Sequence, residues 1–334
     1  MAENLYLLLN AALLVCAGIS VVFWARLLPA IFRQGVRGFA DKWLPVKRRE
    51  CPFWGVAEIF VMFGAMVVSG QLLLLLAQQK GWYKFPEPGA SLADQTPETL
   101  LVVLVISALA NCISIALILL WMWNIDRGNI GKFGLSLNPL MIGLGAKAAV
   151  TLLPPVLAVA ALVNLLVLEY EHEVLDVLQQ LGTPRVFAVL FFGTAIVTPI
   201  AEEILFRGLI QGWLQRLADR VVGQVEPIES DLVDGQLAID EEKAPLSSKN
   251  ADRCNSKAEV TGAMGSWEPV SYWPIFAASI LFASMHMGQG AAPVPLFLLS
   301  LGLGYLYRQT GSLIPCIVVH MILNGMTLLA AMLQ

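Results

Sequence analysis

Long apolar stretches, separated by links rich in charge, glycine or proline, run along almost the whole chain. A transmembrane helix needs about 20 mostly apolar residues. Eight segments approach that description, although the sixth and seventh are short and the fifth contains charged residues. They are residues 5–25, 53–77, 100–123, 140–168, 186–214, 272–287, 293–307 and 313–333. The pattern predicts an all-α, polytopic membrane bundle of about eight transmembrane helices.

Composition supports a membrane protein over a soluble one. Of the 334 residues, 57% are hydrophobic and only 14% are charged, and the mean hydropathy is +0.70. An ordinary soluble domain cannot bury so much apolar surface, so the surplus must face lipid. We therefore expect an integral, multi-pass protein whose environment is the lipid bilayer, with no nucleic acid as a partner.

Basic residues in the links predict how the chain is oriented. Seven Lys and Arg residues lie between residues 26 and 49, directly after the first apolar segment. Such links stay in the cytoplasm, which places the N-terminus outside, and the later links alternate as eight spans with both termini outside require. The first segment lacks a positively charged start, so we expect a retained helix and not a signal peptide.

One polar insertion, at about residues 221–269, interrupts the apolar pattern. It is rich in Glu, Asp, Ser, Lys and Asn, and such composition cannot bury enough apolar surface to offset the entropy of ordering, so we expect a mobile cytoplasmic loop. An amphipathic stretch at 169–181 is expected on the outer surface. The motifs described below divide the chain into N-terminal helices 1 to 4, residues 1–184, and a catalytic core, residues 185–329, that the loop interrupts.

Three ionisable residues stand within the fifth apolar segment. Near the centre of a membrane helix each charge costs about 2.5–3.5 kcal/mol, so three would cost roughly 7–10 kcal/mol, which the apolar residues of the segment barely offset. Glu203 and Arg207 are four residues apart and can neutralise each other on one helix face. Glu202 points elsewhere and has no evident partner on its own helix. A purely structural alternative is that these side chains extend to the membrane interface. We favour a functional site over it.

Two of the three histidines also lie in apolar segments. His286 follows Phe282 by four residues, and His320 precedes Asn324 by four, so each pair shares a helix face. A carboxylate with a His can take a proton from water, and a second His with an Asn amide can stabilise an oxyanion. The same groups, Glu202, His286 and His320, could instead bind a divalent metal such as zinc.

These motifs resemble those of one known family. The patterns Glu202-Glu203-x-x-x-Arg207, Phe282-x-x-x-His286 and His320-x-x-x-Asn324 look like the three motifs of the CAAX-protease and bacteriocin-processing (CPBP, or ABI) family of intramembrane endopeptidases, in the family's order. The resemblance covers about residues 185–329. The long insertion between the first and second motifs departs from what we expect of that family.

The resemblance implies a function and a role for each residue. Glu202 would be the general base that activates water together with His286, Glu203 and Arg207 would organise the site, and His320 and Asn324 would stabilise the oxyanion. The substrate would be a peptide or protein in or at the membrane. The family has been described both as metalloproteases and as metal-independent, and the sequence leaves the cofactor unknown.

Two functions of other classes stay open at this stage. A non-catalytic immunity factor or scaffold of the same fold would use the polar cluster only for structure. A proton-coupled transporter would use buried Glu and His residues as a relay, and Glu58 and Lys147 in other apolar segments slightly favour it.

Overall fold

A computed structural model describes residues 2–84, 96–125, 130–166, 183–222 and 267–333. The described chain is helical throughout, and its one β-bridge joins Arg49 to Trp267. The helices of the N-terminal part are α1 (Ala2–Gln34), α2 (Val36–Trp43), α3 (Val56–Gln79), α4 (Pro97–Ile125), η2 (Ile130–Phe133) and α5 (Pro139–Leu166). Those of the C-terminal part are α7 (Pro184–Leu190), η3 (Phe191–Val197), α8 (Thr198–Glu203), η4 (Ile204–Gln211), α9 (Gly212–Val221), α10 (Trp273–Ser284), α11 (Pro293–Thr310) and α12 (Ile314–Leu333).

The predicted all-α membrane bundle is confirmed, with a refinement of the number of spans. Six of the described helices are long and apolar enough to cross a bilayer. The two segments that were short in the sequence form shorter helices, because α10 has 12 residues and α11 has 18. At 1.5 Å per residue α10 is only about 18 Å long, well under the ~30 Å apolar core of a bilayer. The predicted amphipathic stretch at 169–181 and most of the 221–269 loop lie outside the described residues.

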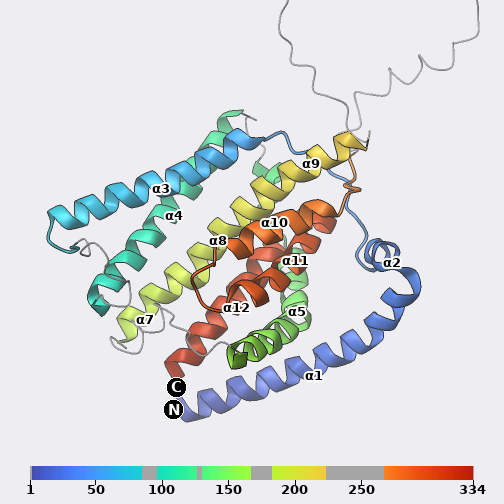
Figure 1. The fold of residues 1–334 in the computed structure, drawn as a ribbon, viewed down its shortest axis with the longest axis horizontal. Helices are drawn as coiled ribbons and strands as arrows, with labels where there is room; N and C mark the ends of the chain where they lie inside the picture. Colours follow the sequence, from blue (N-terminus) through green and yellow to red (C-terminus); the bar gives the residue numbers. More distant parts are fainter. Residues whose placement is uncertain (1, 85–95, 126–129, 167–182, 223–266, 334) are drawn as a thin grey trace, which may run out of the picture.

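A single continuous helical rod forms the centre of the bundle. Elements α7, η3, α8, η4 and α9 follow one another without a break over 38 residues, Pro184–Val221, and Figure 1 shows them as one diagonal helix between the α3–α4 pair and α10–α12. The predicted fifth span, 186–214, is the middle of this rod. Two segments, η3 and η4, are π-helical, a rare local geometry that is often found at functional sites. Glu202 and Glu203 are the two central residues of the rod.

Small residues let neighbouring helices approach the rod and one another closely. A Cβ atom added at Gly208 would lie 2.6 Å from the Phe133 ring, and one at Gly145 would lie 2.9 Å from the Pro315 carbonyl oxygen and 2.8 Å from Cβ of Val318. Membrane helices pack through such contacts because lipid is as apolar as a leucine side chain and gives no hydrophobic driving force. Gly145 therefore sets how closely α5 packs against α12, the helix that carries His320.

This packing can be tested with two alanine substitutions in α5. Gly145→Ala forces the new methyl group into the backbone of α12, and overpacking of this kind costs about 1–3 kcal/mol. Gly143→Ala is the matched control, since nothing lies within 4 Å of a Cβ at that position. We expect thermal unfolding in detergent to show a lower midpoint for Gly145→Ala and an unchanged or slightly higher one for Gly143→Ala. Equal midpoints would contradict the close α5–α12 contact.

Candidate active site

The centre of the rod holds a fully buried ion pair. The Glu203 and Arg207 side chains have no exposed surface, and Oε2 of Glu203 lies 3.2 Å from Nε of Arg207. These two atoms do not form a hydrogen bond with each other, so the attraction between opposite charges holds the pair. The sequence-based expectation that these two residues neutralise each other along one helix face is confirmed.

His320 joins both carboxylates of the rod to α12. Its Nδ1 atom lies 2.9 Å from Oε1 of Glu203, within hydrogen-bond distance, and its Nε2 atom lies 3.5 Å from Oε2 of Glu202. The imidazole is 3% exposed, whereas the Glu202 side chain is 24% exposed. Glu202 is thus the carboxylate of this cluster that a molecule from outside can reach, and it faces an imidazole whose other nitrogen is held by Glu203.

Aromatic and hydroxyl groups complete the surroundings of Arg207. Its Nη2 atom donates a hydrogen bond to Oγ of Ser300 at 2.9 Å, and its guanidinium lies 4.7 Å from the centre of the Phe282 ring. A cation over an aromatic face is attracted by the ring, most strongly where water is excluded. The same ring stands edge-on to Phe206, 5.1 Å between centroids. Arg207 is therefore fixed by α8, α10 and α11 together.

His286 lies just beyond the end of α10. Its ring is half-buried and 4.9 Å from the Phe282 ring, and its Nδ1 atom lies 2.9 Å from the Phe282 carbonyl oxygen. The Glu202 carboxylate interacts electrostatically with both His286 and His320. In the sequence, His286 stands too far along its segment to meet Glu202 in a bundle of parallel, full-length spans. The shortness of α10 removes that difficulty, because the helix ends beside the centre of the rod.

Asn324 links α12 to the central rod. One turn after His320, its amide nitrogen donates to the carbonyl oxygen of Thr194 at 3.0 Å. Thr194 belongs to the π-helical segment η3, whose wider turns leave backbone groups free for such a contact. The bond ties α12 to the rod and uses one of the two N–H groups of the Asn324 amide, so the oxyanion role of this residue stays a prediction.

The expected metal ligands do not form a metal-binding group here. Within the described ranges, no three His, Cys, Asp or Glu side chains converge closely enough to hold a metal ion. In His320, Nδ1 is bonded to Glu203, which leaves Nε2 as the one nitrogen that could face a metal. The donor arrangement of Glu202, His286 and His320 thus does not fit the zinc alternative, and we derive no step through a metal.

Residues outside the three motifs contribute to the site, and sequence reasoning missed them. Ser300 and Thr194 bear ordinary polar side chains in apolar helices, with no spacing signal that links them to Arg207 or Asn324. Glu58, by contrast, has a structural role: it accepts hydrogen bonds from the Gly55 amide at 2.7 Å and from the Trp121 indole at 3.2 Å. Lys147 is exposed on α5. These two residues therefore add nothing to the transporter alternative.

An apolar cavity of about 670 Å³ lies elsewhere, between α1, α5 and α12. Its lining includes Leu13, Leu153 and Met326, and none of the six candidate residues takes part. The cavity and the polar cluster are thus separate features that share only the helix α12.

Fold and site together define a class of protein: a helical membrane protein with a carboxylate and imidazole cluster at the centre of its bundle. Comparison with family models gives a match to "Type II CAAX prenyl endopeptidase Rce1-like" over residues 184–226 and 258–326. This agrees with the family resemblance that the motifs carry, over the part of the chain that holds α7 to α11 and most of α12. Comparisons with curated proteins and with solved structures find no match.

The extent of the match is informative. It covers about a third of the chain and includes all six candidate residues. The unmatched residues between its two blocks, 227–257, fall within the predicted polar insertion. The family therefore supports a CAAX-type membrane endopeptidase in general, built on the central rod and the last three helices.

The buried ion pair makes a testable prediction about stability. Arg207→Leu leaves Glu203 buried without its cationic partner, and breaking a buried pair in this way typically costs about 3–5 kcal/mol. Adding Glu203→Gln removes the unpaired charge, so we expect the double variant to recover part of the loss. Thermal unfolding in detergent measures both. A double variant less stable than Arg207→Leu would show that the pair does not act as described.

Proposed function

We propose that the chain is an intramembrane endopeptidase that hydrolyses a peptide bond of a membrane-associated protein or peptide, with Glu202 as the general base. The observation that carries the proposal is the placement of Glu202. It is the partly exposed carboxylate of a cluster whose other acid, Glu203, is fully buried and paired with Arg207. It lies 3.5 Å from the His320 imidazole and interacts electrostatically with His286. The family match over the same residues supports the reaction class.

The hydrogen bond between Glu203 and His320 fixes the state of that imidazole. An ionised carboxylate only accepts hydrogen bonds, so in this pair the donor is the N–H group at Nδ1 of His320 and the acceptor is Oε1 of Glu203. In the neutral ring, Nε2 is then an acceptor that faces Glu202 at 3.5 Å. A carboxylate that holds a histidine in one tautomer is a recurring device for orienting a base. Here Glu203, itself paired with Arg207, is the orienting group.

The reaction that this arrangement can perform balances simply. Glu202, with His286 beside it, accepts a proton as the water oxygen forms a bond to the substrate carbonyl carbon. The carbon–nitrogen bond then breaks, and the proton returns to the departing amine, which leaves a free carboxylate and a free amine. His320 can share the transferred proton with Glu202 through Nε2. In this scheme His320 acts as a positioning and proton-accepting group, in place of the oxyanion role that the family resemblance implies.

Removal of the base is the direct test. Glu202→Gln keeps the size of the side chain but cannot accept a proton, and loss of general base catalysis typically costs about 10²–10⁴-fold in rate. We expect the Glu202→Gln protein, purified in detergent, to cleave a farnesylated CAAX peptide at least about 10²-fold more slowly than the unaltered protein. Its unfolding midpoint should be unchanged.

The control is a second glutamate in an apolar helix. Glu58→Gln makes the same change outside the cluster and gives up one of the two hydrogen bonds that Glu58 accepts, so its cleavage rate should equal that of the unaltered protein. Comparison of membrane peptidomes from cells that make the unaltered or the Glu202→Gln protein extends the test to substrates other than CAAX peptides. If Glu202→Gln cleaved the peptide at full rate and left the peptidome unchanged, the proposed function would be wrong.

A further inference from the structure

A buried polar stripe continues from the candidate site along the second half of the rod. Its members follow one another at four-residue intervals and are each at most 2% exposed. They are Glu203, Arg207, Gln211, Gln215 and Asp219. Polar groups inside membrane helices are costly and mark functional paths more often than not. The first two members belong to the site, and the other three have no part in the proposed chemistry.

Helix α11 presents a matching row to this stripe. Ser300, Gly304 and Arg308 are also four residues apart, and the first two meet the rod directly: Arg207 donates to Ser300, and Nε2 of Gln211 donates to the Gly304 carbonyl oxygen at 2.8 Å. Gly304 has to be small here, since a Cβ would lie 2.9 Å from Oε1 of Gln211 and 2.8 Å from Ile275. The two rows thus face each other over several turns.

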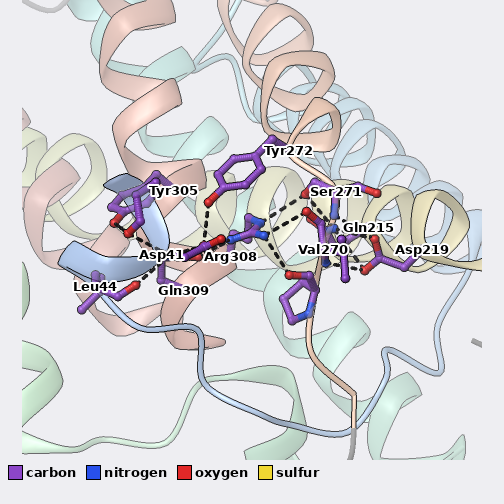
Figure 2. Close-up of polar contacts among 12 residues, drawn as sticks. Asp41, Leu44, Gln215, Asp219, Val270, Ser271, Tyr272, Tyr305, Arg308 and Gln309 are labelled. Atoms are coloured by element: carbon purple, nitrogen blue, oxygen red, sulfur yellow. Dashed lines mark hydrogen bonds and ion pairs between the residues drawn. The ribbon is translucent and has the colours of Figure 1, made fainter. Parts of the chain in front are cut away.

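At the end remote from the site, the stripe meets a polar junction that Figure 2 shows. Gln215 and Arg308 both donate to the Ser271 carbonyl oxygen, at 2.9 and 3.2 Å. Asp219 accepts the backbone amides of Val270 and Ser271, at 3.2 and 3.0 Å. These contacts hold the segment before α10 between the rod and α11.

The junction reaches the surface through Asp41 of α2. Arg308, itself 2% exposed, pairs with Asp41, which is 46% exposed. Partial burial alone would raise the pKa of Asp41, but hydrogen bonds from Tyr272, Gln309 and Arg308 hold it below its ordinary value. The stripe therefore runs from the sealed Glu203 to a partly exposed carboxylate outside the membrane-spanning segments.

Besides the two atoms of the Glu203–Arg207 ion contact, four buried polar atoms along this interface have no hydrogen-bond partner among the described residues. They are Nη1 of Arg207, Oε1 of Gln211, Oε1 of Gln215 and Oγ of Ser279. Ser279 lies on the same face of α10 as Ile275 and Phe282, which border Gln211 and Arg207. An unpaired buried polar atom costs about 1–3 kcal/mol. Four of them along one interface indicate a polar ligand that bonds to each.

The charges along the stripe indicate what that ligand is. Arg207 pairs with Glu203, Arg308 pairs with Asp41, and Asp219 accepts backbone amides, so each charge of the row already has a partner. The unpartnered atoms include both donors and acceptors, which a water molecule can satisfy at once because it makes 2–4 hydrogen bonds in buried sites.

We propose that the interface between η4–α9, α10 and α11 is a binding site for a file of water molecules that links the Asp41–Arg308 junction to Glu203. The purpose of this file rests on the proposed function. Hydrolysis consumes one water molecule for each bond cleaved, and a substrate that covers the exposed side of Glu202 blocks the entry of water from that side. The file supplies water, and a hydrogen-bonded path for protons, from the opposite side of the cluster.

Radiolytic hydroxyl-radical labelling tests the water file without relying on activity, because radicals form from water and label the side chains beside it. Ile275, 5% exposed, and Gln211 meet at Gly304, whereas Ile118 of α4, 0% exposed, lies in an apolar cluster. We expect several-fold faster labelling of Ile275 than of Ile118 in the full-length protein in detergent. The Gln211→Met protein should lose this difference, and Gln71→Met, a matched change at an exposed position of α3, should keep it.

A second variant, Ser279→Ala, and the labelling of Ile118 guard against misfolding of the first variant. If Gln211→Met unfolds, which faster labelling of Ile118 would reveal, Ser279→Ala replaces it and should also slow the labelling of Ile275. Equal rates for Ile275 and Ile118 in the unaltered protein, or a rate at Ile275 that neither folded variant changes, would overturn the proposal. The Glu202→Gln protein should label as the unaltered one does, so lost cleavage with retained labelling would bear on the base alone.

Discussion

The burial of charge within an apolar helix is the constraint on which the rest of this structure depends. Glu203 and Arg207 have no access to solvent, and a charge in such surroundings persists only if partners replace the water it has lost. Each partner comes from a different helix: His320 from α12, Ser300 from α11 and the Phe282 ring from α10. The cost of one ion pair therefore dictates how three further helices pack against the rod.

The same constraint gives the two adjacent glutamates different surroundings. Glu203 is held in place by Arg207 and His320, and its side chain has no exposed surface. Glu202 lies on another face, keeps part of its surface open and faces the second nitrogen of His320 at 3.5 Å. Neighbouring residues of the same type thus provide one sealed and one accessible carboxylate, because the helix turns by about 100° between them.

Sequence reasoning identified the helices, the ion pair and the family, because those follow from local periodicity and from spacing within single helices. Four-residue intervals predicted that Glu203 meets Arg207, and apolar length predicted the spans. The sequence did not predict which residues meet between different helices. Nothing local indicates that Asn324 bonds to Thr194, that Ser300 holds Arg207, or that Arg308, which reads as an ordinary charge in a link, is buried. The four-residue spacing of polar residues at positions 211, 215 and 219 is present in the sequence. It gains meaning only in the structure, where α11 faces these residues.

The clamp around residues 269–272 has a consequence for how this protein can change over evolutionary time. Asp219 binds the amides of that segment and Arg308 binds its carbonyl oxygens, while Arg49 pairs with the backbone of Trp267 just before it. The point at which the chain rejoins the bundle is thereby fixed by the bundle itself. Insertions, deletions or a wholly new module between residues 223 and 266 could then be accommodated without moving α10, and with it Phe282 and His286.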